Sequence, residues 1–193
     1  MKNIAVLASG SGSNLQAIID AVKSKELKDI NISIVISNNE NAFALERAKK
    51  ENIEALFLNP KLFSSNEDYD REIVKILKKR NIDLVVLAGY LKILTNDFIN
   101  AFENKIINIH PSLLPKYGGK GMYGKNVHEA VLKNNEKESG CTVHYVTLGI
   151  DEGKIIAQKK VPVLPDDTVD TLQKRVLEEE HKLLVEAINV IAR

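Results

Sequence analysis

Apolar strand-like runs alternate with helical patterns along most of this chain, and the alternation restricts the possible folds more than any other feature. Residues 83–88 are almost continuously apolar, as in a strand buried on both faces of a parallel sheet. Within residues 14–23, apolar side chains instead recur at the spacing of an amphipathic helix. The expected strands are residues 3–8, 32–36, 54–58, 83–88 and 106–109, and the helices between them are 14–23, 42–50 and 67–79. This order predicts an α/β fold, an open, mostly parallel Rossmann-like sheet with helices on both faces.

The pattern changes after Gly140. Residues 141–147 and 154–163 are typical of two strands joined by a short turn, which predicts an antiparallel C-terminal strand pair. Residues 168–191 follow as one long closing helix, with Asp166, Asp167 and Thr168 as capping candidates. No repeat or linker divides the sequence, so residues 1–193 are expected to form a single domain.

The composition is that of an ordinary globular protein, with 44% hydrophobic and 27% charged residues. The net charge is +1, and basic and acidic residues are interleaved, which argues against a nucleic-acid-binding surface. No apolar run is long enough to cross a membrane, and residues 4–8 are too few for a signal peptide. Cys141 is the only cysteine, so no disulfide can form within the chain. We therefore expect a cytoplasmic protein with no membrane or nucleic-acid partner.

A glycine-rich segment, Ser-Gly-Ser-Gly-Ser-Asn at residues 9–14, links the first strand to the first helix and is called the first loop below. Its glycines let a ligand approach the backbone, and the helix N-terminus offers free N–H groups to an anion. No Gly-Lys-Ser/Thr follows, and Leu15 occupies the third glycine position of a dinucleotide fingerprint. The loop therefore suits a single phosphate, with Ser13 and Asn14 as further donors. The alternative is a turn with a helix cap and no ligand.

A polar pair, Asn108 and His110, ends the strand at residues 106–109. Residues two apart in a strand share a face, so this amide and imidazole project together while Ile107 and Ile109 point into apolar packing. The amide can stabilise a developing oxyanion, and a protonated imidazole can donate a hydrogen bond or a proton. Acyl-type transfer needs both functions. The alternative is a strand-end cap beside a structural core histidine.

A carboxylate in the glycine-flanked turn 149–153 could face this pair across the strand ends. Beside His110 it would favour the imidazolium and raise the pKa of the ring. The spacing does not choose between Asp151 and Glu152, and a solvated turn is the alternative. His144 lies in the middle of a strand, where a structural role is expected. His128 and His181 lie in helical segments, and the histidines, cysteine and acids show no metal-ligand spacing, so no metal is expected.

Four motifs carry a family resemblance: Gly-Ser-Gly-Ser-Asn-Leu-Gln at 10–16, Val-Leu-Ala-Gly-Tyr-Leu-Lys-Ile-Leu at 86–94, Asn-Ile-His-Pro-Ser-Leu-Leu-Pro at 108–115, and the turn around Asp151. In this order they resemble the phosphoribosylglycinamide formyltransferases, which are folate-dependent formyltransferases. The resemblance covers essentially the whole chain. The third motif is shared with methionyl-tRNA formyltransferase and formyltetrahydrofolate deformylase. Those relatives have an added C-terminal or N-terminal domain, which we do not expect here.

The resemblance implies transfer of the formyl group of 10-formyltetrahydrofolate to the amine of 5-phosphoribosylglycinamide, a step of de novo purine biosynthesis. The folate would be a co-substrate, and no metal or covalent enzyme intermediate is required. The single domain would have a nucleotide-binding half at about 1–100 and a folate-binding and catalytic half at about 101–193. Its partners would be small molecules, and the protein would be a monomer or a weak homodimer.

The resemblance also implies roles for particular residues. The catalytic residues would be Asn108, His110 and Asp151. The ribonucleotide site would comprise Gly12, Ser13 and Asn14 on the phosphate and Glu180 on the ribose hydroxyls. The folate site would comprise Leu91, Lys92, Ile93, Leu94, Asn108, Thr147, Leu148, Gly149 and Ile150.

This sequence departs from the family at three places. Arginine is frequent in the family where Lys92 stands and where Asn66 falls, so side-chain contacts to the folate and its glutamate tail are left open. Residues 118–125 also form a longer segment than some members have. The departures at Lys92 and Asn66 do not touch the chemistry.

In the implied mechanism, the neutral glycinamide amine attacks the formyl carbon while Asn108 and protonated His110 stabilise the oxyanion. Asp151 keeps His110 protonated and positions a water that relays the proton to the leaving nitrogen. Two alternatives remain. A non-catalytic nucleotide-binding module would use the first loop alone, and a deformylase would use water in place of the amine.

Overall fold

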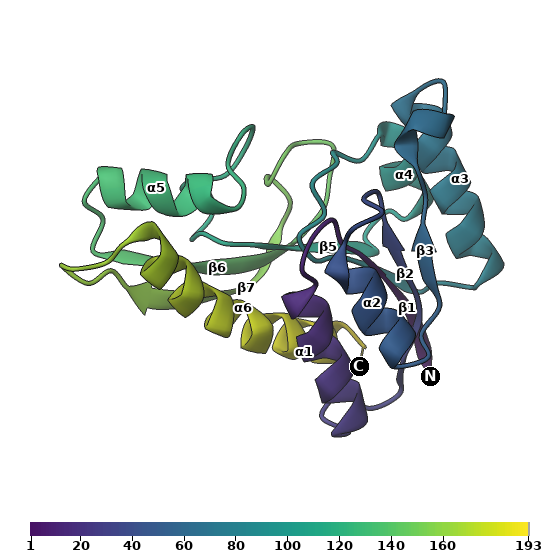
Figure 1. The fold of residues 1–193 in the computed structure, drawn as a ribbon, viewed down its shortest axis with the longest axis horizontal. Helices are drawn as coiled ribbons and strands as arrows, with labels where there is room; N and C mark the ends of the chain where they lie inside the picture. The colour runs from purple at the N-terminus through teal and green to yellow at the C-terminus, as the bar shows by residue number, and fades with distance from the viewer. Residues whose placement is uncertain (193) are drawn as a thin grey trace.

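A computed structural model describes residues 1–192 and shows one seven-stranded sheet in the order β3-β2-β1-β4-β5-β6-β7 (Figure 1). The strands are β1 (Lys2–Leu7), β2 (Ile30–Ser37), β3 (Ala55–Phe57), β4 (Leu84–Leu87), β5 (Ile106–His110), β6 (Glu138–Tyr145) and β7 (Ile155–Pro162). The first five strands pair in parallel, and the pairs β5–β6 and β6–β7 are antiparallel. The predicted fold class is confirmed.

Helices cover both faces of this sheet, as predicted (Figure 1). They are α1 (Ser13–Lys23), α2 (Phe43–Lys50), α3 (Asn66–Lys79), α4 (Asn96–Ala101), α5 (Lys125–Lys133) and α6 (Val169–Ala192), with a single 3₁₀ turn, η1 (Pro60–Leu62). Successive side chains of each strand point to opposite faces of the sheet. In β1, Ile4 and Val6 join an apolar cluster with α1, α2 and α6, whereas Ala5 and Leu7 join a second cluster with α3 and α4.

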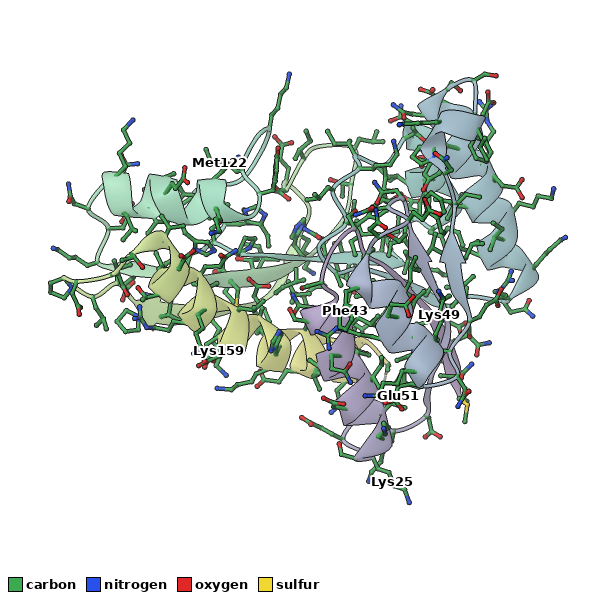
Figure 2. All side chains as sticks on the ribbon, viewed as in Figure 1. Lys25, Phe43, Lys49, Glu51, Met122 and Lys159 are labelled. Carbon is green, nitrogen blue, oxygen red and sulfur yellow. The ribbon has the colours of Figure 1, made fainter. Side chains whose placement is uncertain are left out.

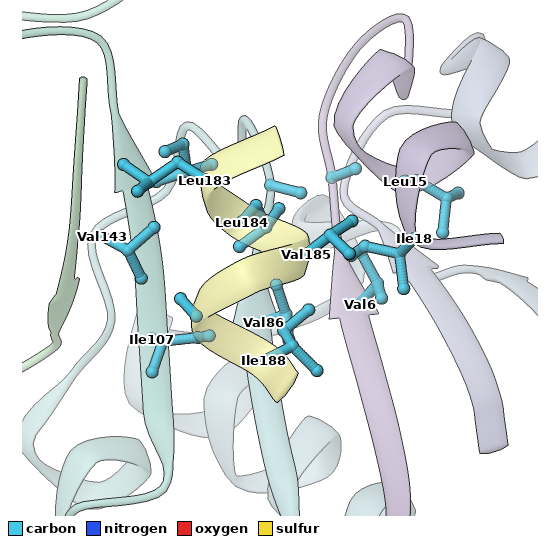
Figure 3. Packing of buried hydrophobic residues seen from close by; sticks show 14 of the residues in the cluster. Val6, Leu15, Ile18, Val86, Ile107, Val143, Leu183, Leu184, Val185 and Ile188 are labelled. Carbon is cyan, nitrogen blue, oxygen red and sulfur yellow. The ribbon is translucent and has the colours of Figure 1, made fainter. Parts of the chain in front are cut away.

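The long helix α6 lies across the centre of the sheet (Figure 3). Its residues Leu184 and Ile188 are fully buried in the cluster that also contains Ile107 of β5 and Val143 of β6. Burying a side chain of this size contributes about 1.5–3 kcal/mol relative to exposure. Thr168 caps the helix by accepting the N–H of Thr171 at 3.2 Å, which selects it from the three capping candidates.

Most element ends lie within two residues of their predicted positions, but one expectation was wrong and one short helix was missed. The connection between β6 and β7 spans residues 146–154 and is no short turn, because β6 already ends at Tyr145. The six-residue helix α4 was not predicted, since so short a segment shows little periodicity. Both segments contribute to the site described next.

The register of β5 brings its polar pair to the carboxyl edge of the sheet. Leu87, the last residue of β4, lies opposite Asn108, so β5 extends beyond its parallel neighbour. On the other side, His144 of β6 is the partner of Asn108. Asn108 and His110 therefore lie where parallel sheets bind their ligands.

Candidate active site

A cleft of about 650 Å³ opens at this edge of the sheet. Every predicted site residue lines it, including those of the first loop, the polar pair of β5, residues 91–94, residues 147–151, and Glu180 of α6. Leu91, Ile93 and Leu148 are large apolar residues of the lining that are 61%, 66% and 63% exposed. Exposed apolar side chains that converge on one cleft favour a ligand with a flat, partly apolar body.

The imidazole of His110 lies between a backbone carbonyl and a carboxylate. Its Nε2 is 2.8 Å from the carbonyl oxygen of Tyr117, and a carbonyl only accepts, so Nε2 carries a proton. Its Nδ1 is 3.6 Å from Oδ2 of Asp151. Any hydrogen bond that His110 donates to a ligand on the side of Asp151 must therefore come from Nδ1, which requires the imidazolium form.

Asp151, and not Glu152, is the carboxylate that faces the polar pair. Its backbone is in the left-handed region at φ 58°, which aspartate tolerates better than most residues. Its Oδ2 also accepts the backbone N–H of Gly119 at 3.0 Å. Glu152 is exposed and does not line the cleft. The structure thus resolves the choice that spacing left open.

At both His110 and Asp151, burial and neighbouring polar groups shift the pKa in opposite directions. Burial lowers the pKa of His110, and although the Asp151 carboxylate and the Tyr117 carbonyl raise it, the pKa stays below its ordinary value. Burial raises the pKa of Asp151, but the proximity of the His144 and His110 rings and the hydrogen bond from the Gly119 N–H outweigh burial and hold it below its ordinary value. Asp151 is therefore ionised at neutral pH. Its effect on the pKa of His110 has the expected direction, and burial of the ring opposes it.

His144 belongs to the same network, which sequence reasoning missed. Its Nδ1 donates to the carbonyl of Tyr145 at 2.9 Å, so its Nε2 is free to accept from the Asn108 amide at 3.1 Å. The same Nε2 is 3.6 Å from Oδ1 of Asp151. His144 consequently orients the amide of Asn108 and leaves its second N–H available to a ligand. Nothing in the strand pattern distinguished this histidine from a structural one.

The first loop has the geometry of an anion site. Gly12 caps α1 with φ 72°, and among residues 1–192 no side chain caps the helix N-terminus with a hydrogen bond. The amide of Asn14 donates to Glu180 at 2.8 Å, and its Oδ1 is buried without a partner. Glu180 is 8% exposed, and burial raises its pKa to about 6. A helix N-terminus with free N–H groups beside a buried carboxylate can hold a phosphate next to hydroxyl groups.

Lys92 and Asn66, the two positions at which arginine is frequent in the family, contact each other. The Lys92 ammonium donates to Oδ1 of Asn66 at 2.9 Å and lies 5.2 Å from the centre of the Tyr69 ring. His128 is a further cleft residue without a sequence signal, and burial lowers its pKa to about 4. Within residues 1–192, no three His, Cys, Asp or Glu side chains are grouped as a metal site. In the same range, no helix is long and apolar enough to cross a membrane.

The chain is similar to known proteins along almost its whole length. The family model described as formyl transferase matches residues 2–188. The phosphoribosylglycinamide formyltransferase of Haemophilus influenzae is 45% identical over 95% of this chain and 84% of its own length. The trifunctional purine biosynthetic protein adenosine-3 of Drosophila melanogaster is 45% identical over 93% of this chain, which spans only 13% of that protein.

A solved structure shows the same fold. Glycinamide ribonucleotide transformylase 1 of Symbiobacterium toebii superimposes with a TM-score of 0.94 at 42% sequence identity. The superposition covers all of this chain and 88% of that one.

Proposed function

The chain belongs to the formyl transferase family, and on that basis we propose that it transfers a formyl group from 10-formyltetrahydrofolate to the amine of 5-phosphoribosylglycinamide in purine biosynthesis. The observation that carries the proposal is one cleft that joins an anion site at the first loop to the group of Asn108, His110 and Asp151. A module that only binds nucleotides would use the first loop and leave that group without a role.

Both ligand sites draw on both halves of the chain. The ribonucleotide phosphate binds the N-terminus of α1 at Gly12, Ser13 and Asn14, and Glu180 of α6 binds the ribose hydroxyls. The folate lies between residues 91–94 and residues 147–150, where Leu91, Ile93 and Leu148 cover its ring and backbone groups bind its polar edge. We therefore treat residues 1–193 as one catalytic domain, whose nucleotide-binding and folate-binding halves meet at the cleft.

Catalysis then follows from what the three polar residues can do. The neutral amine attacks the formyl carbon, forming a carbon–nitrogen bond and a tetrahedral oxyanion. The free N–H of Asn108 and the Nδ1–H of His110 stabilise that oxyanion. As its negative charge develops beside Nδ1, the imidazolium becomes more favourable than it is in the ligand-free protein. Asp151 and a water take the proton from the amine to the leaving nitrogen, and the bond to the folate breaks.

The proposal is tested by measuring consumption of 10-formyltetrahydrofolate with and without 5-phosphoribosylglycinamide. A transferase consumes the donor only when the acceptor is present. Consumption at the same rate without acceptor would identify a deformylase instead. We also propose a cytoplasmic location. We propose in addition that the protein is a monomer or a weak homodimer, and sedimentation over a range of concentrations tests this oligomeric state.

We expect Asp151→Asn to lower the pKa of His110, because the carboxylate is the main group that favours the imidazolium. A fall of about one unit is the size typical of losing one nearby charge. Activity that depends on imidazolium decreases as pH rises through this pKa, so the decrease should move to lower pH and activity near pH 7 should drop. NMR titration of His110 and a pH–rate profile measure the two effects.

Glu152→Gln provides the matched control, because it removes an exposed carboxylate one residue away without changing the cleft lining. It should leave the His110 titration unchanged. If Asp151→Asn also left the titration unchanged, Asp151 would have no part in setting the protonation of His110.

Residues 117–125 are expected to act as a lid over the bound substrates. Four glycines fall within residues 118–124, and Met122 lies in this segment next to α5 (Figure 2). Tyr117 and Gly119 also hold His110 and Asp151 through their backbones, so ordering of the segment would act on the catalytic group. Amide exchange here should be rapid in the free protein and slow when both ligands bind. Equal exchange with and without ligands would mean that the segment is only a long connection.

A further inference from the structure

Residues 89–95, called the donor loop here, connect β4 to α4 without helix or strand structure. This loop supplies Leu91, Lys92, Ile93 and Leu94 to the folate side of the cleft. A loop without a backbone ladder keeps its shape only if other groups satisfy and fix its N–H and C=O groups. Two buried polar side chains do this, one near each end of the loop. One of them, Ser9, is the first residue of the first loop, but it is not among the phosphate-binding residues Gly12, Ser13 and Asn14.

Ser9 holds the beginning of the donor loop. Its hydroxyl accepts the backbone N–H of Leu91 at 2.9 Å and donates its own hydrogen to Oδ1 of Asn38 at 2.6 Å. Its backbone N–H donates to the carbonyl of Gly89 at 3.0 Å. Ser9 is 6% exposed and follows β1, so this end of the loop is fixed to the centre of the sheet.

Asp70 of α3 holds the other end. Its Oδ2 accepts the backbone N–H of Thr95 at 2.7 Å, and the residue is 1% exposed. Burying a carboxylate is costly, and burial raises the pKa of Asp70, although the Thr95 hydrogen bond and the charge of Lys92 act in the opposite direction. The Asp70 carboxylate therefore attracts the Lys92 ammonium in addition to accepting the Thr95 N–H.

A third set of contacts shows that α3 also supports the buried side of the donor loop, the side away from the cleft. Lys92 contacts Asn66 and the Tyr69 ring, as described above, and the hydroxyl of Tyr90 donates to that of Tyr69 at 3.4 Å. Tyr69, Asp70 and Tyr90 are all buried, whereas Leu91 and Ile93 between the two anchors are exposed to the cleft. The loop is thus fixed on one side and open to a ligand on the other.

We propose that Ser9 and Asp70 are positioning residues that hold the two ends of the donor loop and thereby set the affinity for the formyl donor. The proposal rests on the proposed function, because it assumes that the donor loop contacts the folate. Neither side chain touches the reacting atoms, so the effect falls on donor binding. The first loop beyond Ser9 is supported separately, by Ala44 of α2, whose N–H donates to the carbonyl of Gly10 at 3.1 Å.

The test compares three variants at Asp70 and Ser9 in the full-length protein. Asp70→Leu and Ser9→Ala each remove the acceptor for one loop N–H, and we expect the KM for 10-formyltetrahydrofolate to rise about 10-fold, as for loss of one buried hydrogen bond. Asp70→Asn keeps an oxygen acceptor for Thr95 and should restore most of the donor affinity. The kcat and the Kd for the ribonucleotide should change less than about 3-fold.

Amide exchange supplies a second readout that does not depend on activity. Exchange of the Leu91 amide should accelerate in Ser9→Ala, and that of Thr95 in Asp70→Leu, while exchange in β4 stays as in the wild type. Asp68→Asn is the matched control, because Asp68 lies on the same helix, has a side chain that is 45% exposed, and pairs with Arg71 at 2.9 Å. If Asp70→Leu does not fold, donor KM and amide exchange are compared in Ser9→Ala and Asp70→Asn instead.

Wild-type donor KM in both Ser9→Ala and Asp70→Leu would overturn the proposal. So would an equal loss of donor and ribonucleotide affinity, since that would indicate general damage to the fold. The proposed function fails in a different way, by absence of formyl transfer in the wild type. In that case the exchange rates of Leu91 and Thr95 still decide whether the two side chains hold the loop.

Discussion

Replacing His110 with alanine should lower kcat by about 10²–10³-fold, the typical cost of losing one oxyanion donor. The Km for either substrate should change little, because the Nδ1–H is needed when charge develops and less in the ground state. Asn108→Ala should have a similar effect for the same reason. Steady-state kinetics with both substrates varied provide the measurement.

The control for this experiment is His181→Gln, which changes a histidine of α6 that does not line the cleft. It should keep wild-type kcat. Thermal unfolding of each variant separates lost chemistry from lost structure. A folded His110→Ala protein with full activity would rule out the proposed mechanism.

Replacing Gly12 with valine should weaken ribonucleotide binding about 10²-fold, as expected when one or two charge-assisted hydrogen bonds to phosphate are lost. A Cβ at this position would lie 2.7 Å from the Cα of Ala44, and φ is 72°, which a β-branched residue rarely adopts. The first loop must therefore move away from α2, and its N–H groups no longer converge on the phosphate. Titration calorimetry with the ribonucleotide and with the folate measures the two affinities separately.

Folate affinity should change little in Gly12→Val, since the donor loop is held by Ser9 alone among the first-loop residues, and Ser9 is itself fixed by Asn38 and by the carbonyl of Gly89. Gly10→Ala is the control for stability, because a Cβ there would meet nothing within 4 Å. Equal losses of both affinities in Gly12→Val would indicate a folding defect and would remove the support that this variant gives to a phosphate site.

The parallel part of the fold was predictable because its signals are local. Strands such as β4 are short apolar runs, and helices such as α3 show clear periodicity and begin at a serine cap, with Ser65 accepting the Asp68 N–H at 3.0 Å. The shared face of Asn108 and His110 followed from strand geometry alone. The antiparallel pair was predicted as well, but the length of its connection was not, because strand ends depend on partners that the sequence does not show.

The second layer of the site was not predictable from the sequence. His144 contacts Asn108 because β6 pairs with β5 in one register, and Asp70 reaches Thr95 because α3 packs beside the donor loop. Both contacts join segments that are distant in sequence. The pKa of His110 could not be foreseen for the same reason: a nearby carboxylate can be inferred from the motifs, but the extent of burial cannot.

The central claim is that this chain moves a formyl group from a folate to the amine of phosphoribosylglycinamide. It is tested most directly by supplying 10-formyltetrahydrofolate labelled at its formyl carbon and identifying the labelled product by NMR. We predict that the label appears in an amide on the ribonucleotide, and that it does so only in the presence of the acceptor. Label recovered as free formate, at a rate independent of the acceptor, would contradict the claim.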